Sequence, residues 1–251
     1  MKLSNVSLSI LAAAALSLPV LPALGQAETA PKPEAKQPEA DKPKTDDKTD
    51  TKPAKEEAKL VYVNMKTSMG DLVIELNQDK APITVKNFLN YVDKQHYHNT
   101  IFHRVISTFV LQGGGFGTDL KEKSTDKSIK NEWQNGLKNT RGSLSMARTS
   151  DPDSATSQFF INVKDNADLD MGGPRYGGAA YAVFGRVVAG MEVVDKIKVV
   201  PTGTKPFASG MQMSDVPKTN VVIESVTRMT DDDAKKAIDK TAKSADAPEK
   251  K

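Results

Sequence analysis

Apolar and polar residues alternate along several short stretches between residues 60 and 229. In residues 60–66 and 72–76 this alternation has a period of two and flanks a polar, glycine-containing segment at 68–71, which predicts a β-hairpin. Further strand-like runs follow at residues 101–106, 109–112, 142–147, 158–163, 181–187 and 221–228. The pattern therefore predicts a mainly β domain built from many short strands.

Two stretches have helical periodicity instead. Pro82 suits the first turn of a helix, and the residues after it form one apolar stripe. This stripe consists of Val85, Phe88, Leu89 and Val92. A second short helix is expected over residues 191–197, again with one apolar side. Many short strands, glycine-rich connections and two helices favour a closed antiparallel barrel, although the pattern alone leaves a β-sandwich open.

The two ends of the chain differ in composition from this middle part. Residues 1–25 start with a lysine-containing segment, continue with an apolar run at 6–18 and end in small residues, which predicts a signal peptide. The apolar run is too short for a bilayer-spanning helix, and an uncleaved anchor is the alternative interpretation. Residues 26–59 lack aromatic residues, Val, Ile and Leu, so we expect a disordered tether. Residues 230–251 form a charged tail, expected as a frayed helix or a disordered segment. One folded domain is thus expected at 60–229.

Composition excludes several classes of site. The 251 residues include no cysteine, which excludes disulfides, thiolate metal sites and a lipid anchor on cysteine. The formal net charge is +3, without a cluster of basic residues interleaved with aromatics. Nucleic-acid binding is therefore not expected.

The residues that could form a functional site lie in two segments about fifty residues apart. The first contains Phe102, His103 and Arg104 and continues through residues 109–114, and the second covers residues 157–161. Together they offer an arginine, two glutamine amides and several aromatic rings. Such a set is poorly suited to cutting a bond, but it can hold an apolar ring and donate hydrogen bonds to a neighbouring amide. These properties suit a site directed at proline.

The order and spacing of both segments resemble the cyclophilin family of peptidyl-prolyl cis-trans isomerases, and the resemblance extends over residues 60–229. It implies a closed eight-stranded antiparallel β-barrel capped by two α-helices, with the active site in a groove on the outer face. It also implies isomerisation of X-Pro bonds in unfolded or extended polypeptides, without a cofactor or a metal.

The resemblance also assigns roles to residues. Arg104 would be the catalytic residue, which stabilises the prolyl nitrogen as it becomes pyramidal. Four apolar side chains would line the proline pocket, while Gln112 and the backbone of residues 147 and 148 would hold the substrate chain. The substrate-binding set is Phe102, His103, Phe109, Val110, Gln112, Ala147, Arg148, Gln158, Phe160, Leu169 and Tyr181.

Three positions depart from the family pattern. Asp168 stands where many members carry a tryptophan that contacts cyclosporin, so weak or no cyclosporin binding is expected. Tyr181 replaces a pocket histidine, and Val110 replaces a methionine that is usual in the pocket. We expect these changes to tune affinity rather than to abolish isomerisation.

Three other kinds of site have candidate residues in this sequence: a metal site, a phosphate-binding loop and a serine hydrolase site. His96, His98 and His103 lie close together in sequence, but no carboxylate is placed to complete a metal site with them. The glycines at 113–115 lack the lysine and hydroxyl of a phosphate-binding loop. A serine hydrolase has its candidates in Ser143, Ser145 and Ser154, none of which lies in a Gly-x-Ser-x-Gly motif.

The alternative closest to the isomerase is a non-catalytic chaperone module that holds proline-containing segments in the same groove. For the isomerase we expect a monomer that is exported and helps exported proteins to fold. Its location would be the periplasm, or outside the cell if the host has a single membrane, and no membrane span would remain after signal cleavage.

Overall fold

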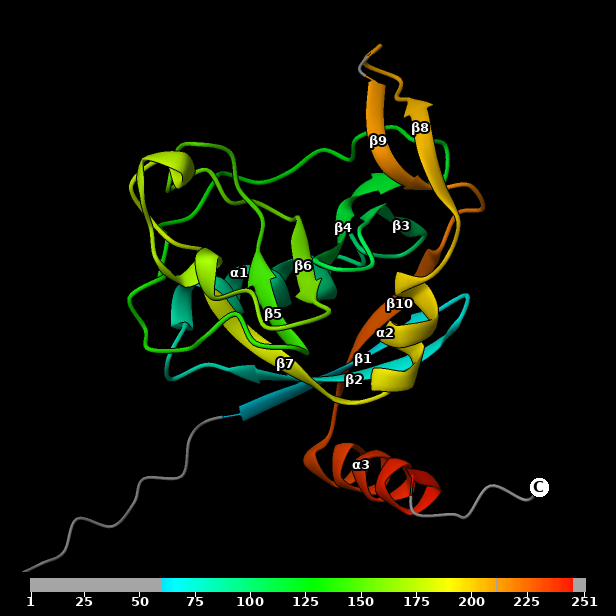
Figure 1. Cartoon of the computed structure of the whole chain (residues 1–251). Coiled ribbons are helices and arrows are strands. Elements are labelled where there is room, and N and C mark those ends of the chain that lie inside the picture. The colour runs from blue at the N-terminus through cyan, green and yellow to red at the C-terminus, as the bar shows by residue number, and fades with distance from the viewer. Residues whose placement is uncertain (1–59, 211, 246–251) are drawn as a thin grey trace, which may run out of the picture. The chain divides into compact units, whose positions relative to one another are not determined.

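The computed structural model describes residues 60–210 and 212–245. The expected signal peptide and tether lie outside these residues. In the described part, eight antiparallel strands close into a barrel in the order β1-β10-β3-β4-β6-β5-β7-β2 (Figure 1). These strands are β1 Leu60–Thr67, β2 Gly70–Asn77, β3 Thr100–Val105, β4 Val110–Gly117, β5 Ser143–Met146, β6 Phe159–Asn162, β7 Val183–Ala189 and β10 Val222–Met229. The expected barrel is confirmed.

The first two strands form the predicted hairpin, because each residue of β1 pairs with a residue of β2 from Leu60–Asn77 to Thr67–Gly70. Side chains with a period of two then point into the barrel and build one core. This core includes Val63, Met65, Leu72, Ile74, Phe102, Leu111, Phe159 and Phe184.

Both predicted helices are present. Helix α1 (Pro82–Asp93) begins with its proline and buries the expected apolar stripe, and α2 (Met191–Lys198) buries Val193, Val194 and Ile197. Short 3-10 helices η1 (Ala167–Asp170) and η2 (Pro174–Tyr176) lie in the connection between β6 and β7.

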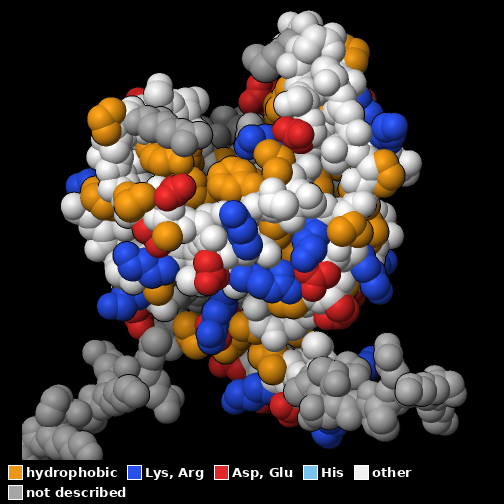
Figure 2. All heavy atoms as spheres, viewed as in Figure 1, with side chains coloured by type: hydrophobic (Ala, Val, Ile, Leu, Met, Phe, Trp, Pro, Cys, Tyr) orange, Lys and Arg blue, Asp and Glu red, His pale blue; other side chains and the backbone are white. Residues whose placement is uncertain are grey.

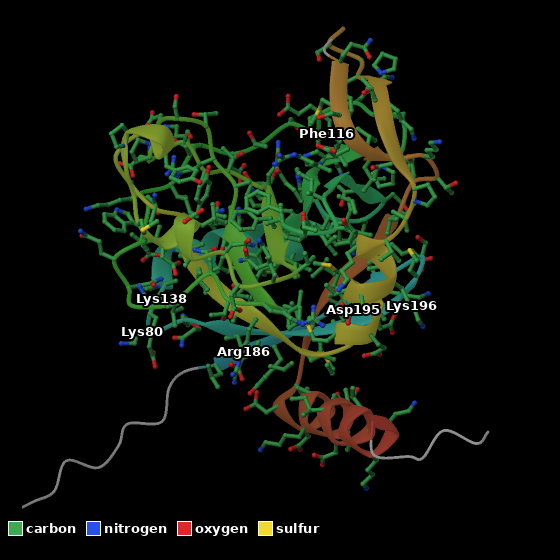
Figure 3. The ribbon with its side chains drawn as sticks, viewed as in Figure 1. Lys80, Phe116, Lys138, Arg186, Asp195 and Lys196 are labelled. Carbon is green, nitrogen blue, oxygen red and sulfur yellow. The ribbon has the colours of Figure 1, made fainter. Side chains whose placement is uncertain are left out.

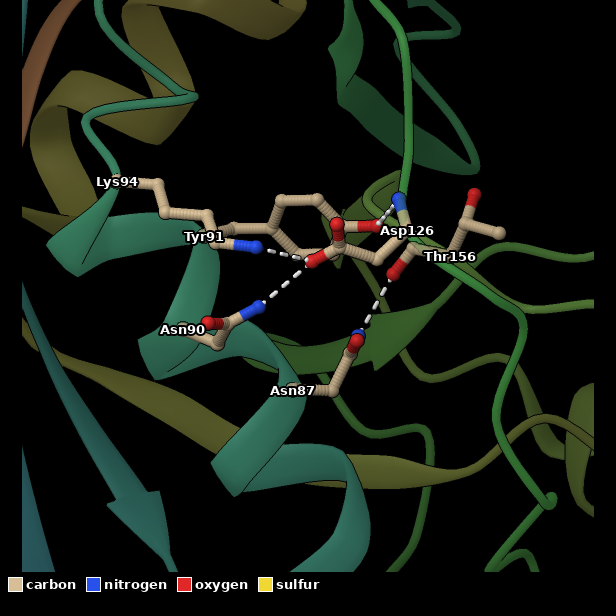
Figure 4. A network of polar contacts seen from close by, with 6 residues as sticks. All are labelled: Asn87, Asn90, Tyr91, Lys94, Asp126 and Thr156. Atoms are coloured by element: carbon tan, nitrogen blue, oxygen red, sulfur yellow. Dashed lines mark hydrogen bonds and ion pairs between the residues drawn. The ribbon is translucent and has the colours of Figure 1, made fainter.

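Polar side chains on α1 hold the long connection from β4 to β5 against the barrel (Figure 4). Asn90 and Lys94 both donate to the carboxylate of Asp126, at 2.8 and 2.7 Å, and the backbone N–H of Asp126 donates to the Tyr91 hydroxyl. Asn87 donates to the carbonyl of Thr156 just before β6. Helix α1 thereby fixes one point in the connection from β4 to β5 and one just before β6.

Two features differ from the sequence-based expectation. Strands β8 (Thr202–Pro206) and β9 (Gln212–Pro217) form a separate two-stranded hairpin, a segment that shows little alternation of apolar and polar residues. A third helix, α3 (Asp231–Ala245), contacts β1, β2 and β7. Ala234 of α3 is fully buried against Val73 and Ala189, so this part of the charged tail is a docked helix.

No helix in the described residues is long and apolar enough to cross a membrane.

Candidate active site

The groove forms where β3, β4 and β6 run side by side on the outer surface of the barrel. Arg104 of β3 pairs with Gln112 of β4, which in turn pairs with Phe160 of β6. The register of β3 against β4 shifts between Phe102 and Arg104. Such a bulge redirects side chains, and here Phe102 is 0% exposed in the core whereas the Arg104 side chain is 36% exposed. Phe102 therefore does not reach the groove.

The main pocket has a volume of about 260 Å³. Its apolar part is a cluster separate from the barrel core, formed by buried Val110, Phe160 and Leu169 with half-buried Phe109 and Tyr181 packed around them. The pocket brings together most of the site residues expected from the sequence. Its lining is Arg104, Phe109, Val110, Gln112, Ala147, Arg148, Phe160, Leu169, Tyr176 and Tyr181. Figure 2 shows apolar side chains in the hollow between the β8–β9 hairpin and the rest of this face.

Arg104 contributes the cation at the edge of this apolar pocket. Its Nε atom lies 4.0 Å from a carboxylate oxygen of Asp215 on β9, and both side chains are more than one third exposed. A solvent-exposed pair at this distance interacts weakly. The guanidinium N–H donors therefore remain available for a ligand.

The two glutamines are joined to each other. The Gln112 amide donates to the side-chain carbonyl of Gln158 at 3.0 Å. Gln158 borders a second cavity of about 200 Å³ next to the main pocket, together with Thr149, Ser154 and Thr156. It thus lies beside the main pocket rather than in its lining, and it orients Gln112, which borders both cavities.

Arg148 holds one side of the pocket in place. Its guanidinium donates to the carbonyls of Tyr176, Ala179 and Ala180 and lies 4.5 Å from the centre of the Tyr181 ring. Tyr181 in turn packs edge-to-face against Phe160 and Tyr176. The side chain of Arg148 therefore positions aromatic lining residues.

His103 does not line the main pocket but borders an adjoining cavity. It is 1% exposed, and burial together with the nearby Arg104 charge lowers its pKa to about 4. The imidazole is therefore neutral at pH 7 and packs edge-to-face against Phe116 at 4.7 Å. A neutral, buried ring in this place fits a structural role better than that of a general acid.

The rival chemistries find no support in the described part of the chain. Ser143 and Ser145 are buried and donate to the Thr140 carbonyl and the Asn139 side chain, while Ser154 donates to the Asp151 carbonyl. These hydrogen bonds join none of the three to a histidine. Within the described residues, no group of three or more His, Cys, Asp or Glu side chains is arranged to hold a metal.

Sequence reasoning missed two residues at the site. Tyr176 follows a glycine-rich, non-periodic segment, and Asp215 belongs to the unpredicted hairpin. An aromatic residue five positions before Tyr181 was a weak signal for the first, and nothing in the local pattern indicates the second.

Comparisons with known proteins agree with this geometry. Residues 62–228 match the family model described as cyclophilin type peptidyl-prolyl cis-trans isomerase/CLD. Peptidyl-prolyl cis-trans isomerase B of Escherichia coli is 58% identical over 165 residues, which are 66% of this chain and 98% of the relative. A peptidyl-prolyl cis-trans isomerase of Acinetobacter baylyi is 58% identical over 164 residues, which are 65% of this chain and 83% of the relative.

A solved structure shows the same fold. The cyclophilin type isomerase of Cryptosporidium parvum, crystallised in the presence of the dipeptide Ala-Pro, aligns with a TM-score of 0.56 and 29% identity over 68% of this chain and 99% of its own. The family match covers nearly the whole barrel, and the relatives are highly identical over most of their length. The chain therefore belongs to the cyclophilin-type peptidyl-prolyl cis-trans isomerases.

Proposed function

We propose that this isomerase accelerates X-Pro isomerisation in extended segments of exported proteins, with Arg104 stabilising the prolyl nitrogen in the transition state. The observation that carries this assignment is the position of Arg104, whose guanidinium borders an apolar pocket of about 260 Å³. Residues 1–25 have the pattern of a signal peptide and support export. The intact mass of the protein recovered from cell fractions would test whether they are removed.

The physics of the reaction explains why this arrangement suffices. Rotation about a peptide bond faces a barrier of roughly 18 to 20 kcal/mol, because the nitrogen lone pair is delocalised into the carbonyl. The two X-Pro isomers are close in energy, so a catalyst only has to lower this barrier. No covalent bond is made or broken. A permanently charged donor near the nitrogen favours the state in which the lone pair is localised.

The remaining residues have supporting roles in the proposal. Val110, Phe160 and Leu169 would hold the pyrrolidine ring, and Tyr181 would complete the apolar lining. Gln112 and the backbone at residues 147 and 148 would hold the flanking chain while the carbonyl rotates. Fixing one side of the bond while the other turns reduces the number of unproductive orientations.

The test is isomer exchange in an Ala-Pro peptide, followed by NMR with the purified full chain. We expect rapid exchange with the parent and roughly 100-fold slower catalysis with Arg104→Ala, the loss typical for one preorganised charged donor. Arg186→Ala is the matched control, because Arg186 lies on β7 and pairs with Glu75 on the barrel surface. It should catalyse as fast as the parent.

The same experiment distinguishes the chaperone alternative. If the parent binds the peptide without accelerating exchange, the protein holds proline-containing segments and the catalytic proposal is wrong. If Arg104→Ala catalyses as well as the parent, isomerisation stands but the role of Arg104 does not.

A further inference from the structure

A third cavity lies next to the proline pocket, between β4 and the β8–β9 hairpin. Its volume is about 330 Å³. Figure 3 labels Phe116, which lies beside the β8–β9 hairpin. The apolar part of the lining consists of Phe116, Leu120, Phe207 and Met213. None of these residues was expected at a site from the sequence, and none belongs to the proline pocket.

Ring packing and hydrogen bonds hold the walls of this third cavity, a groove beside the hairpin, in place. The Phe116 ring lies between those of His103 and Phe207, with its centre 4.7 Å from each of their centres. Two hydrogen bonds tie the hairpin and the segment after it to the turn after β4. The backbone N–H of Ala208 donates to the Leu120 carbonyl, and the Asn220 amide donates to the Thr118 carbonyl. A groove held on both sides in this way needs little reorganisation to accept a side chain.

The groove is continuous with the proline pocket. Gln112 borders both cavities, and Asp215 of the hairpin lies 4.0 Å from Arg104, which lines the proline pocket. A polypeptide with its proline in the main pocket and its backbone near Gln112 therefore passes the opening of the groove. The adjoining cavity is thus reachable by the same bound chain.

We propose that this groove binds a large apolar side chain of the same polypeptide, at a position outside the X-Pro pair, and so selects among proline-containing clients. The proposal rests on the isomerase function above. Phe116, Phe207 and Met213 supply an adaptable apolar surface, since methionine and aromatic side chains fit varied apolar partners. The exposed carboxylate of Glu122 lies at the same cavity, so an acidic client residue would be repelled.

The test uses alanine-based peptides with one central Ala-Pro unit, in which a single phenylalanine is moved through three positions on each side. Both the dissociation constant and the exchange rate are measured by NMR with the full chain. We expect one position to bind about tenfold more tightly than the all-alanine peptide, the gain for burying much of an apolar side chain. Met213→Ala and Phe207→Leu should each remove most of this gain while binding the all-alanine peptide as the parent does.

Val199→Ala is the matched control, because Val199 is an apolar residue just before β8 whose side chain is largely exposed and outside the groove. The Val199→Ala variant should still bind the best phenylalanine-containing peptide more tightly than the all-alanine peptide. The proposal is overturned if no phenylalanine position binds more tightly, or if the gain persists in both groove variants. Failure of the isomerase proposal gives a different result, since exchange would then stay slow for every peptide while the dissociation constants still report on the groove.

Discussion

Arg104 and His103 are neighbours in the chain but lie in opposite surroundings. The bulge in β3 leaves Arg104 at the exposed groove, while His103 packs against Phe116. Burial lowers the pKa of His103 and removes its charge at neutral pH, whereas the Arg104 side chain is 36% exposed. One strand thus supplies a cation to the site and a neutral aromatic ring to the layer beneath it.

The lowered pKa of His103 predicts a loss of stability in acid. Its pKa is about 4 in the folded chain and near 6.5 in an unfolded one. The unfolded state therefore binds the extra proton between these values, and the free energy of unfolding falls as pH drops from about 6.5 to about 4. Urea unfolding at pH 7.5 and 4.5 should show roughly 2 to 3 kcal/mol more acid destabilisation in the parent than in His103→Gln. Equal pH dependence in both proteins would contradict a buried neutral imidazole.

Glycines in strand β4 allow it to pack closely against neighbouring side chains. Gly114 has a φ of +85°, and a Cβ there would lie 2.9 Å from the rings of both Phe159 and Tyr97. Gly115 is similarly close to the Gln158 side chain. These glycines allow the strand to run directly over core rings and beside the paired glutamines. They serve packing, in agreement with the close backbone approach that glycine permits.

Gly114→Ala is accordingly expected to be severely destabilising. The new methyl group combines an unfavourable left-handed backbone with a clash against two packed rings, at a cost of about 3 kcal/mol. Gly136→Ala is the matched control, since Gly136 also has a positive φ of +82° but open space around its Cβ position. It should lose only about 1 kcal/mol. Urea unfolding of both variants checks this, and similar losses would show that backbone strain alone is responsible.

The barrel separates its functional face from the place where α3 docks. The groove belongs to β3, β4 and β6, whereas α3 contacts β1, β2 and β7 (Figure 1). Ala234 anchors the helix on Val73 and Ala189. We therefore expect α3 to contribute to the stability of the chain and not to its catalysis.

Truncation after Thr230 tests this separation. Isomerisation of the Ala-Pro peptide should change less than about twofold, while the free energy of unfolding falls by about 1 to 2 kcal/mol through loss of the apolar contact. Ala234→Asp in the full chain should reproduce the loss of stability, because it buries an unpaired carboxylate. Lys235→Ala, at an exposed position next to it, should not. A large fall in catalysis by the truncated chain would instead connect α3 to the site.

Several parts of the fold could be predicted because their signals are local. The period of two in residues 60–66 and 72–76 and the stripe from Val85 to Val92 each reflect which side of one element faces the core. The motif around Arg104 indicated the family in the same local way. The β8–β9 hairpin and the docking of α3 gave no such signal, since their polar composition resembles that of a loop or a tail.

The sequence by itself determined the class of fold, the two core helices and most of the residues that line the main pocket, with Tyr176 as an exception. Alternation, helical spacing and motif order are properties of residues near one another in sequence, so they can be detected without a structure. Only the tertiary structure decided that Phe102 points inward, that Gln158 orients Gln112, that Asp215 approaches Arg104, and that Phe207 packs against Phe116. Those relations depend on a bulge and on contacts between residues from 46 to 111 positions apart, which the tertiary fold brings together.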